Sequence, residues 1–403
     1  GQKLLPATAA IAGAGAAAVS SADDMRSAVN SYLTATGEMA DGTEEATESA
    51  EQLEEVLGNI YKGNYGESLE DVAQAAATVK KNMQDIPVDG LQEATESAIA
   101  LRDIFGYDIP ETTRAAGTLM NQFGISADEA FNLIAQGAQN GLDYSGELLD
   151  SINEYSVQFK KVGLDAEDMF NIFATGADNG AFNLDKIGDA VKEFSIRAVD
   201  GSDTTAEGFK AAGLNAEKMS EKFAAGGESA KEAFRETIQA MKDMEDPLER
   251  NIAGVNLFGT MWEDLGETVV LSMGDAEKSI DATTDAMEKL KKQKYDDLKN
   301  EFAQIGREIK TDVVIPLGQD LIPIIKEALQ WIKQLVAGFS ELSPEGRKAV
   351  LVIGAITAAA GPLLISIGQV TTGVGALMSG IKMLTPMLTA LSGPGGVILL
   401  TVA

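Results

Sequence analysis

A motif that recurs between residues 121 and 230 constrains the fold of this chain more than any other feature. Two clear copies and a weaker third are residues 123–141 (FGISADEAFNLIAQGAQNG), 162–180 (VGLDAEDMFNIFATGADNG) and 212–230 (AGLNAEKMSEKFAAGGESA). Their leading glycines, Gly124, Gly163 and Gly213, lie 39 and 50 residues apart. A period of about forty residues is typical of helical hairpins that stack on one another.

Each copy carries the start and stop signals of one helix. Ser126, Asp165 and Asn215 are residue types that cap helix N-termini, and Ser126 with Glu129 fits a capping box. The sequence predicts that these three helices end at Gly137, Gly176 and Gly226. A second helix is predicted after each of the first two copies, over residues 146–161 and 183–198.

The second helices carry apolar residues on one face. At helical spacing these are Leu148, Ile152, Tyr155 and Phe159 in the first, and Ile187, Val191 and Phe194 in the second. Such a stripe predicts the buried face of an amphipathic helix. Phe170, which falls inside the second copy, is expected in the same core.

Several kinds of chemistry are excluded by composition. The chain contains no Cys and no His, so thiolate nucleophiles, disulfides, Cys/His zinc sites and Ser-His-Asp triads are ruled out. The net charge is −30, from 32 basic and 62 acidic residues, and this balance argues against direct binding of nucleic acid. We expect no cofactor, no metal site and no enzymatic activity.

Changes in composition divide the chain into five predicted segments, and the whole is predicted to be all-α. They are a small-residue helical lead (1–40), an acidic helical segment (41–120), the hairpin repeats (121–275), coiled-coil-like helices (276–340) and an apolar helical segment (341–403). Residues 1–303 carry a charge of −31 and residues 304–403 carry +1. The chain lacks an initiator Met and stops within an apolar run, which predicts a fragment of a longer protein.

A narrow apolar seam marks residues 276–340 and predicts a partner helix, because an unpaired chain would leave it in water. The seam residues singled out are Leu298, Phe302, Ile305, Ile309, Ile322, Ile325, Leu329 and Ile332. Self-association of these helices is one expected interaction. Pro316, Gly318 and Pro323 are predicted to break the helix within the seam.

No charged side chain occurs from residue 349 to residue 381, and residues 349–368 alone have the length that a bilayer span requires. Small residues follow at every fourth position: Gly368, Thr372, Ala376 and Gly380. This spacing allows helices to approach closely. The segment is a candidate transmembrane hairpin, and the alternative interpretation is a hairpin buried in a large assembly.

Several stretches, taken in order, resemble the phage-related minor tail proteins, the tape-measure proteins of long-tailed phages and of phage-like tail particles. They are residues 108–120 (DIPETTRAAGTLM), 137–170, 180–197 (GAFNLDKIGDAVKEFSIR), 200–203 (DGSD), 257–266 (LFGTMWEDLG) and 342–364. These stretches lie within residues 105–270 and in the apolar segment, and the resemblance covers over half of the chain.

The resemblance implies a long helical protein threaded through the lumen of the tail tube, whose length sets the length of the tail. It also implies later ejection and help with genome passage across the cell envelope. Implied partners are tail tube and tail tip proteins and tail assembly chaperones. Implied locations are the virion tail lumen, the host cytoplasm during assembly and the host membrane after ejection.

Two other functions compete with this structural role. One is a membrane-perturbing protein in which residues 349–403 form a helical hairpin pore and the acidic part is a soluble domain. The other is a cell-wall hydrolase with Glu263 and Asp264 as a carboxylate pair. Adjacent residues in one helix point about 100° apart, which argues against that pair. Trp262 is expected to pack against Phe258 and Leu265 in the same helix instead.

Overall fold

The computed structural model describes residues 5–38, 44–84, 86–276, 279–295 and 298–324 of the chain. Every regular element among these residues is helical and none is a strand, which confirms the predicted all-α class for this part of the chain. The chain divides into two compact units. One contains Gly1–Asp23 with Lys310–Ala403, and the other contains Asp24–Ile309.

Helix α1 (Leu5–Thr36) has residues in both units. The helices of the second unit are α2 (Glu44–Lys62), α3 (Leu69–Asn82), α4 (Val88–Phe105), α5 (Ile109–Phe123), α6 (Ala127–Gln139), α7 (Leu148–Lys161), α8 (Ala166–Asp178), α9 (Leu184–Arg197), α10 (Asp203–Ala211), α11 (Ala216–Ala225), α12 (Gly227–Lys242), α13 (Pro247–Phe258), α14 (Met261–Ser272), the 3-10 helix η1 (Met273–Asp275), α15 (Ala286–Tyr295) and α16 (Leu298–Ile309).

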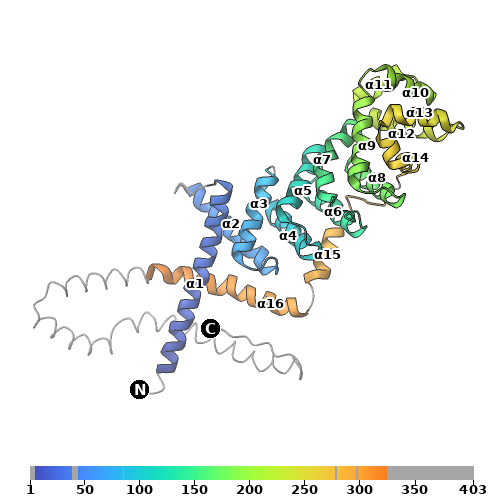
Figure 1. The fold of residues 1–403 in the computed structure, drawn as a ribbon. Helices are drawn as coiled ribbons and strands as arrows, with labels where there is room; N and C mark the ends of the chain where they lie inside the picture. The colour runs from blue at the N-terminus through green and yellow to red at the C-terminus, as the bar shows by residue number, and fades with distance from the viewer. Residues whose placement is uncertain (1–4, 39–43, 85, 277–278, 296–297, 325–403) are drawn as a thin grey trace, which may run out of the picture. The chain divides into compact units, whose positions relative to one another are not determined.

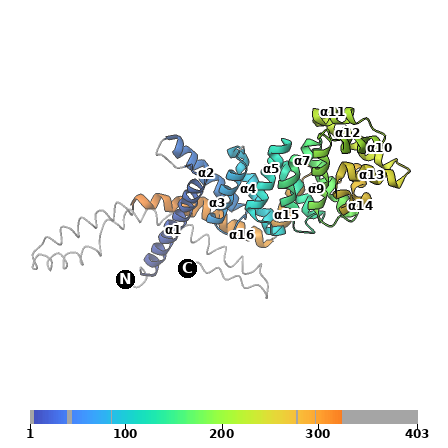
Figure 2. The same cartoon turned by 45° about the horizontal axis from the view of Figure 1, so that its top comes forward.

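Helices α2 to α9 of the second unit form two rows (Figures 1 and 2). In the first row α3 contacts α5, α5 contacts α7, and α7 contacts α9. In the second row α2 contacts α4, α4 contacts α6, and α6 contacts α8. Consecutive helices along the chain thus belong to alternate rows, and each hairpin stacks on the one before it. We call this arrangement the hairpin stack.

The first two copies of the sequence motif form α6 and α8, as predicted. Ser126 and Asp165 each accept a hydrogen bond from the backbone N–H three residues on, and each belongs to a complete capping box. The predicted apolar stripes of α7 and α9 are buried, and Phe170 is fully buried, as expected.

The prediction that Gly137 and Gly176 end their helices is wrong. Both lie inside their helices, which continue to Gln139 and Asp178. A methyl group on Gly137 would come within 2.9 Å of the Phe170 ring, and one on Gly176 within 2.6 Å of the Ile187 side chain. These glycines are required by the close approach of neighbouring side chains and not by backbone conformation. The third prediction holds, because Gly226 follows the last residue of α11 with a positive φ of 69°.

The weaker third copy does not continue the rows. Asn215 caps α11 as predicted, but α11 packs mainly against α12 and α10. A physical reason is visible in the motif. The position of Phe131 in α6 and Phe170 in α8, both fully buried, is occupied by Ser220 in α11. Without that aromatic side chain, the third copy has less apolar surface to place against a preceding hairpin.

Helices α10 to α14 form a bundle beside α9, centred on aromatic side chains. Phe194 of α9 stacks on Phe258 with ring centroids 4.9 Å apart. It also meets the edges of Phe223 and Phe234, both at 5.3 Å. This cluster joins the last helix of the hairpin stack to α11, α12 and α13.

In the first unit, the described residues include the π-helix η2 (Lys310–Val314) and the helical residues 315–324. The chain stays helical through Pro316, Gly318 and Pro323 as far as residue 324, where the described residues end, so the predicted break is wrong. Pro316 lacks an N–H and its ring would crowd the carbonyl group four residues earlier. The wider turn of η2 immediately before it accommodates this defect. Gly318 lies against the backbone of Ala18, where a side chain would not fit.

Candidate functional site

Two asparagines at the same position of the motif, Asn132 of α6 and Asn171 of α8, are buried although they are polar. Buried amide groups need hydrogen-bond partners. Theirs come from residues 279–295, a segment that follows the aromatic bundle in sequence and returns along the second row of the hairpin stack (Figure 1). We call residues 279–295 and 298–309 the return segment.

The amide side chains hold the backbone of the return segment. The Oδ1 atom of Asn171 accepts hydrogen bonds from the backbone N–H groups of Ser279 and Ile280, both at 2.9 Å. Its Nδ2 atom donates to the carbonyl oxygen of Ile280, also at 2.9 Å. Gln136 of α6 makes the same two-way contact with the backbone of Asp281, donating at 2.6 Å and accepting at 3.1 Å. The two helices thus bind this backbone as a neighbouring strand would.

Further contacts continue along the row toward α2. The Asn132 side chain accepts from the backbone N–H of Met287 at 2.9 Å, at the start of α15, which packs on α4 and α6. Tyr295 donates its hydroxyl to Asp103 of α4 at 2.9 Å. Arg307 of α16 donates to backbone carbonyl groups at the end of α2, including that of Tyr61 at 3.1 Å. Burial lowers the pKa of this guanidinium group.

The return segment therefore touches α8, α6, α4 and α2 in turn. The buried apolar side chains that anchor it are Ile280, Ala282, Met287 and Leu290. The sequence predicted coiled-coil-like helices for residues 276–340. The described residues from 279 to 285 form no α-helix and α15 is short, whereas residues 298–324 are helical throughout. The signal that could have revealed this segment is the repeated Asn next to a buried Phe in both copies of the motif.

We expect Asn171→Ala to release the first part of the return segment. The change removes one acceptor and one donor, and it leaves the backbone N–H and carbonyl groups of Ile280 buried without partners, so we expect a loss of about 2–4 kcal/mol in unfolding free energy. Hydrogen exchange should accelerate at the backbone N–H of Ile280. The matched control is Asn179→Ala, because Asn179 bonds only the carbonyl of Thr175 on the surface. Equal exchange rates in the two variants would contradict the role given to Asn171.

The seam predicted to bind a partner helix is only partly within the described side chains. Phe302 and Ile305 are 42% and 51% exposed, and Ile309 and Ile322 are partly buried. The side chain of Leu298 and residues Ile325, Leu329 and Ile332 lie outside the described part. A partner helix for this seam stays a prediction.

The small-residue face at Gly368, Thr372, Ala376 and Gly380 lies outside the described residues, as does the whole apolar segment 341–403. Among the helices that the structure describes, none combines the length and the apolar character that crossing a bilayer requires. The transmembrane prediction concerns residues outside the described part and stays a prediction.

The carboxylate pair of the hydrolase hypothesis lies at the start of α14. Asp264 makes an ion pair with Lys186 at 2.8 Å. Trp262 is buried against Phe258, with ring centroids 6.4 Å apart, and its Nε1 donates to Asn251 at 2.9 Å. The contact with Phe258 is as predicted, but the two residues lie in different helices, α14 and α13, and not in one helix. No group of three or more acidic side chains in the described residues has the geometry to hold a metal ion.

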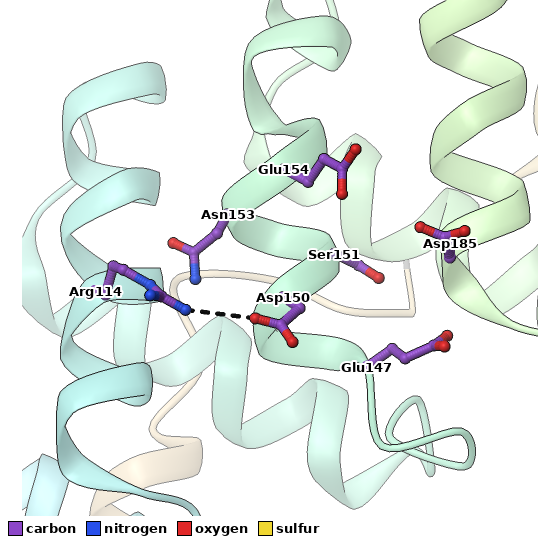
Figure 3. Close-up of a pocket in the computed structure, with 7 residues that line it drawn as sticks. All are labelled: Arg114, Glu147, Asp150, Ser151, Asn153, Glu154 and Asp185. Atoms are coloured by element: carbon purple, nitrogen blue, oxygen red, sulfur yellow. Dashed lines mark hydrogen bonds and ion pairs between the residues drawn. The ribbon is translucent and has the colours of Figure 1, made fainter.

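A cleft with a volume of about 570 Å³ lies along the first row of the hairpin stack (Figure 3). Its lining residues come from α5, from α7 and the residue before it, and from α9, and they are Arg114, Glu147, Asp150, Ser151, Asn153, Glu154 and Asp185. We call this the acidic cleft. Four of its lining residues are carboxylates and one is a guanidinium group.

Comparisons with known proteins place these features in context. The profile of the family described as phage-related minor tail protein matches residues 57–259, half of the chain. A probable tape measure protein of Streptomyces phage phiC31 is 36% identical over 281 residues, which is 68% of this chain and 38% of that protein. An uncharacterized protein, YqbO, of Bacillus subtilis (strain 168) is 32% identical over 292 residues, 69% of this chain and 18% of that protein. No solved structure matches.

Proposed function

We propose that this chain, which belongs to the phage-related minor tail protein family, is a structural segment of a tape-measure protein that sets the length of a phage tail. The observation that carries the proposal is the family match over residues 57–259, which takes in most of the hairpin stack and the aromatic bundle. The chain spans less than two fifths of the phage relative that it resembles, so it would supply one part of the ruler.

Three further elements belong to this proposal. The protein would occupy the lumen of the tail tube and contact tube and tip proteins, and tail assembly chaperones would accompany it in the host cytoplasm. It would later assist genome passage through the cell envelope. The role is non-enzymatic. The net charge of −30 supports a place in the lumen, because an acidic protein surface would repel DNA that moves past it.

Tail length can show whether the hairpins stay stacked or open into one extended helix inside the tail. Deleting residues 142–180 removes one period of 39 residues and joins Gly141 to Ala181, at equivalent points of the motif. If the segment is a single extended helix in the tail, the tail should shorten by about 58 Å, at about 1.5 Å per residue. If the hairpins stay stacked, the loss should be about 10 Å, the usual spacing of packed helices.

The measurement is tail length by electron microscopy in phage carrying the deletion within the complete tape-measure protein. Duplicating residues 142–180 is the matched variant, and it should lengthen the tail by the same amount. We expect opposite changes of equal size from the two variants. Assembled tails of unchanged length with both variants would show that this region does not act as a ruler.

A further inference from the structure

The return segment joins points of the hairpin stack that lie far apart in the sequence. The backbone N–H of Ile280 donates to Asn171 of α8 at 2.9 Å. The hydroxyl of Tyr295 donates to Asp103 of α4 at 2.9 Å, and the Nζ atom of Lys294 donates to the backbone carbonyl of Asp103 at 3.2 Å. Fifteen residues of the return segment thus connect two helices whose bonded residues are 68 residues apart.

These contacts and an open form of the hairpins exclude one another. If α4 to α8 were one straight helix, the 68 residues from Asp103 to Asn171 would span about 102 Å, at about 1.5 Å per residue. The fifteen residues from Ile280 to Tyr295 reach at most about 54 Å when fully extended. The return segment must therefore leave α8 or α4 before the hairpins can open into one helix.

The return segment can leave without breaking the core of the hairpin stack. The rows pack on each other through their own side chains, such as Phe159 of α7 and Phe173 of α8, whose ring centroids are 5.4 Å apart. The return segment is held by four buried apolar side chains and by hydrogen bonds that water can replace. Segments with few buried apolar contacts open at a lower free energy than the whole fold.

Helix α15 of the return segment is opposite in charge to the helix on which it lies. It carries four lysines and one glutamate in ten residues, although the chain has a net charge of −30. Helix α4 carries four acidic residues and one basic residue. Burial raises the pKa of Glu96 in α4, and the positive charge of Lys291 in α15 opposes that rise. Opposite charges direct a docking segment to its position more than they tighten its binding.

We propose that residues 279–295 of the return segment are a conformational lock on the hairpin stack. In the docked state they hold α4, α6 and α8 in their stacked order, and the hairpins open only after these residues have left. The lock closes last, because its residues follow every helix of the stack in the sequence. The proposal concerns the conformations of this chain and does not depend on whether it sets tail length.

The test is hydrogen exchange of the full chain, followed helix by helix by mass spectrometry, in a variant that cannot dock the return segment. Ile280→Asp with Met287→Asp places charges at two positions that are buried in the docked state. We expect exchange to accelerate about 100-fold in α4, α6 and α8, and by a similar factor in α5 and α7 of the other row. Exchange in α10, α11 and α13 of the aromatic bundle should stay within about two-fold.

The control makes the same change in net charge on the exposed side of the same helix. Lys292→Gln with Gln293→Glu alters two exposed residues of α15, and exchange should stay within about two-fold of the original in every helix. Two milder variants, Ile280→Ala and Met287→Ala, cover the case in which the double variant does not fold. Each should accelerate exchange about ten-fold, again in both rows.

Three outcomes would overturn the proposal. Acceleration confined to α4, α6 and α8 would show that the return segment covers these helices without locking the stack. Equal acceleration in the aromatic bundle would show that it stabilises the whole chain and not the stack in particular. Unchanged exchange in all helices would show that it controls no opening. Tail length enters none of these measurements, so failure of the lock and failure of the proposed ruler are separate results.

Discussion

Gly163→Ala is expected to lower the free energy of unfolding by about 4 kcal/mol, the largest effect we predict for a single methyl group in this chain. Gly163 has a positive φ of 79°, which costs an L-residue about 1 kcal/mol or more. The added methyl group would also overlap the carbonyl oxygen of Gly227 and the backbone nitrogen of Lys231. Backbone atoms of α12 cannot swing aside as a side chain can, so overpacking adds up to about 3 kcal/mol.

The sequence motif supplies matched controls for this prediction. Gly124 and Gly213 occupy the same position in the other two copies, with φ values of 74° and 77°, and a methyl group on either would meet no neighbouring atom within 4 Å. Gly124→Ala and Gly213→Ala should therefore cost only the conformational part, about 1 kcal/mol. Urea unfolding of the three variants separates close packing from backbone conformation. Equal losses in all three would show that α12 does not lie as closely on this turn as described.

This comparison shows which features of the fold are visible in the sequence. The three glycines are indistinguishable in the motif, because the local backbone requirement is the same at each. The contact that separates Gly163 from the others comes from α12, more than sixty residues later. Caps such as Ser126 and the stripe that includes Phe194 are local and periodic, and they were predicted correctly.

The candidate sites were harder to predict for the same reason. The return segment depends on backbone groups of residues 279–287 meeting side chains of α6 and α8 more than a hundred residues earlier. The sequence held one clue, the polar Asn132 and Asn171 each beside a buried Phe, but nothing local identified their partners. The acidic cleft is similar, since its carboxylates resemble the ordinary solvated faces of an acidic chain until α7 and α9 bring them together.

The second prediction concerns Lys231 of α12, which binds the capping box of α8. Its Nζ lies 2.7 Å from Asp165 and also contacts Asp168, and the Lys231 and Asp168 side chains are nearly buried. We expect Lys231→Met to lower the free energy of unfolding at pH 7 by about 3 kcal/mol, because it leaves a buried carboxylate short of its counter-charge. The remaining contact of Asp168 with Arg235, at 3.4 Å, keeps the loss at the lower end of the range for buried pairs.

The pKa shifts of Asp165 and Lys231 determine the pH range in which their ion pair stabilises the fold. Burial by itself would raise the pKa of Asp165, but the ion pair with Lys231 and the backbone N–H of Asp168 outweigh it and lower that pKa. The stabilisation is therefore complete above the unfolded value of about 3.9 and is lost as the pH falls through the lower folded pKa. The pKa of Lys231 is raised by both carboxylates against the effect of burial, so its part is lost only at alkaline pH.

The measurement is the difference in unfolding free energy between the original chain and Lys231→Met, followed from pH 8 to pH 2. Taking the difference cancels the other acidic groups, which titrate in both proteins. We expect a constant difference down to about pH 4 and a steady decrease below it. Lys222→Met removes the same charge from an exposed pair with Glu236 on α12, and it should produce no pH-dependent difference. A difference for Lys231→Met that persists unchanged to pH 2 would mean that Lys231 stabilises α8 through packing of its stem and not through the carboxylates.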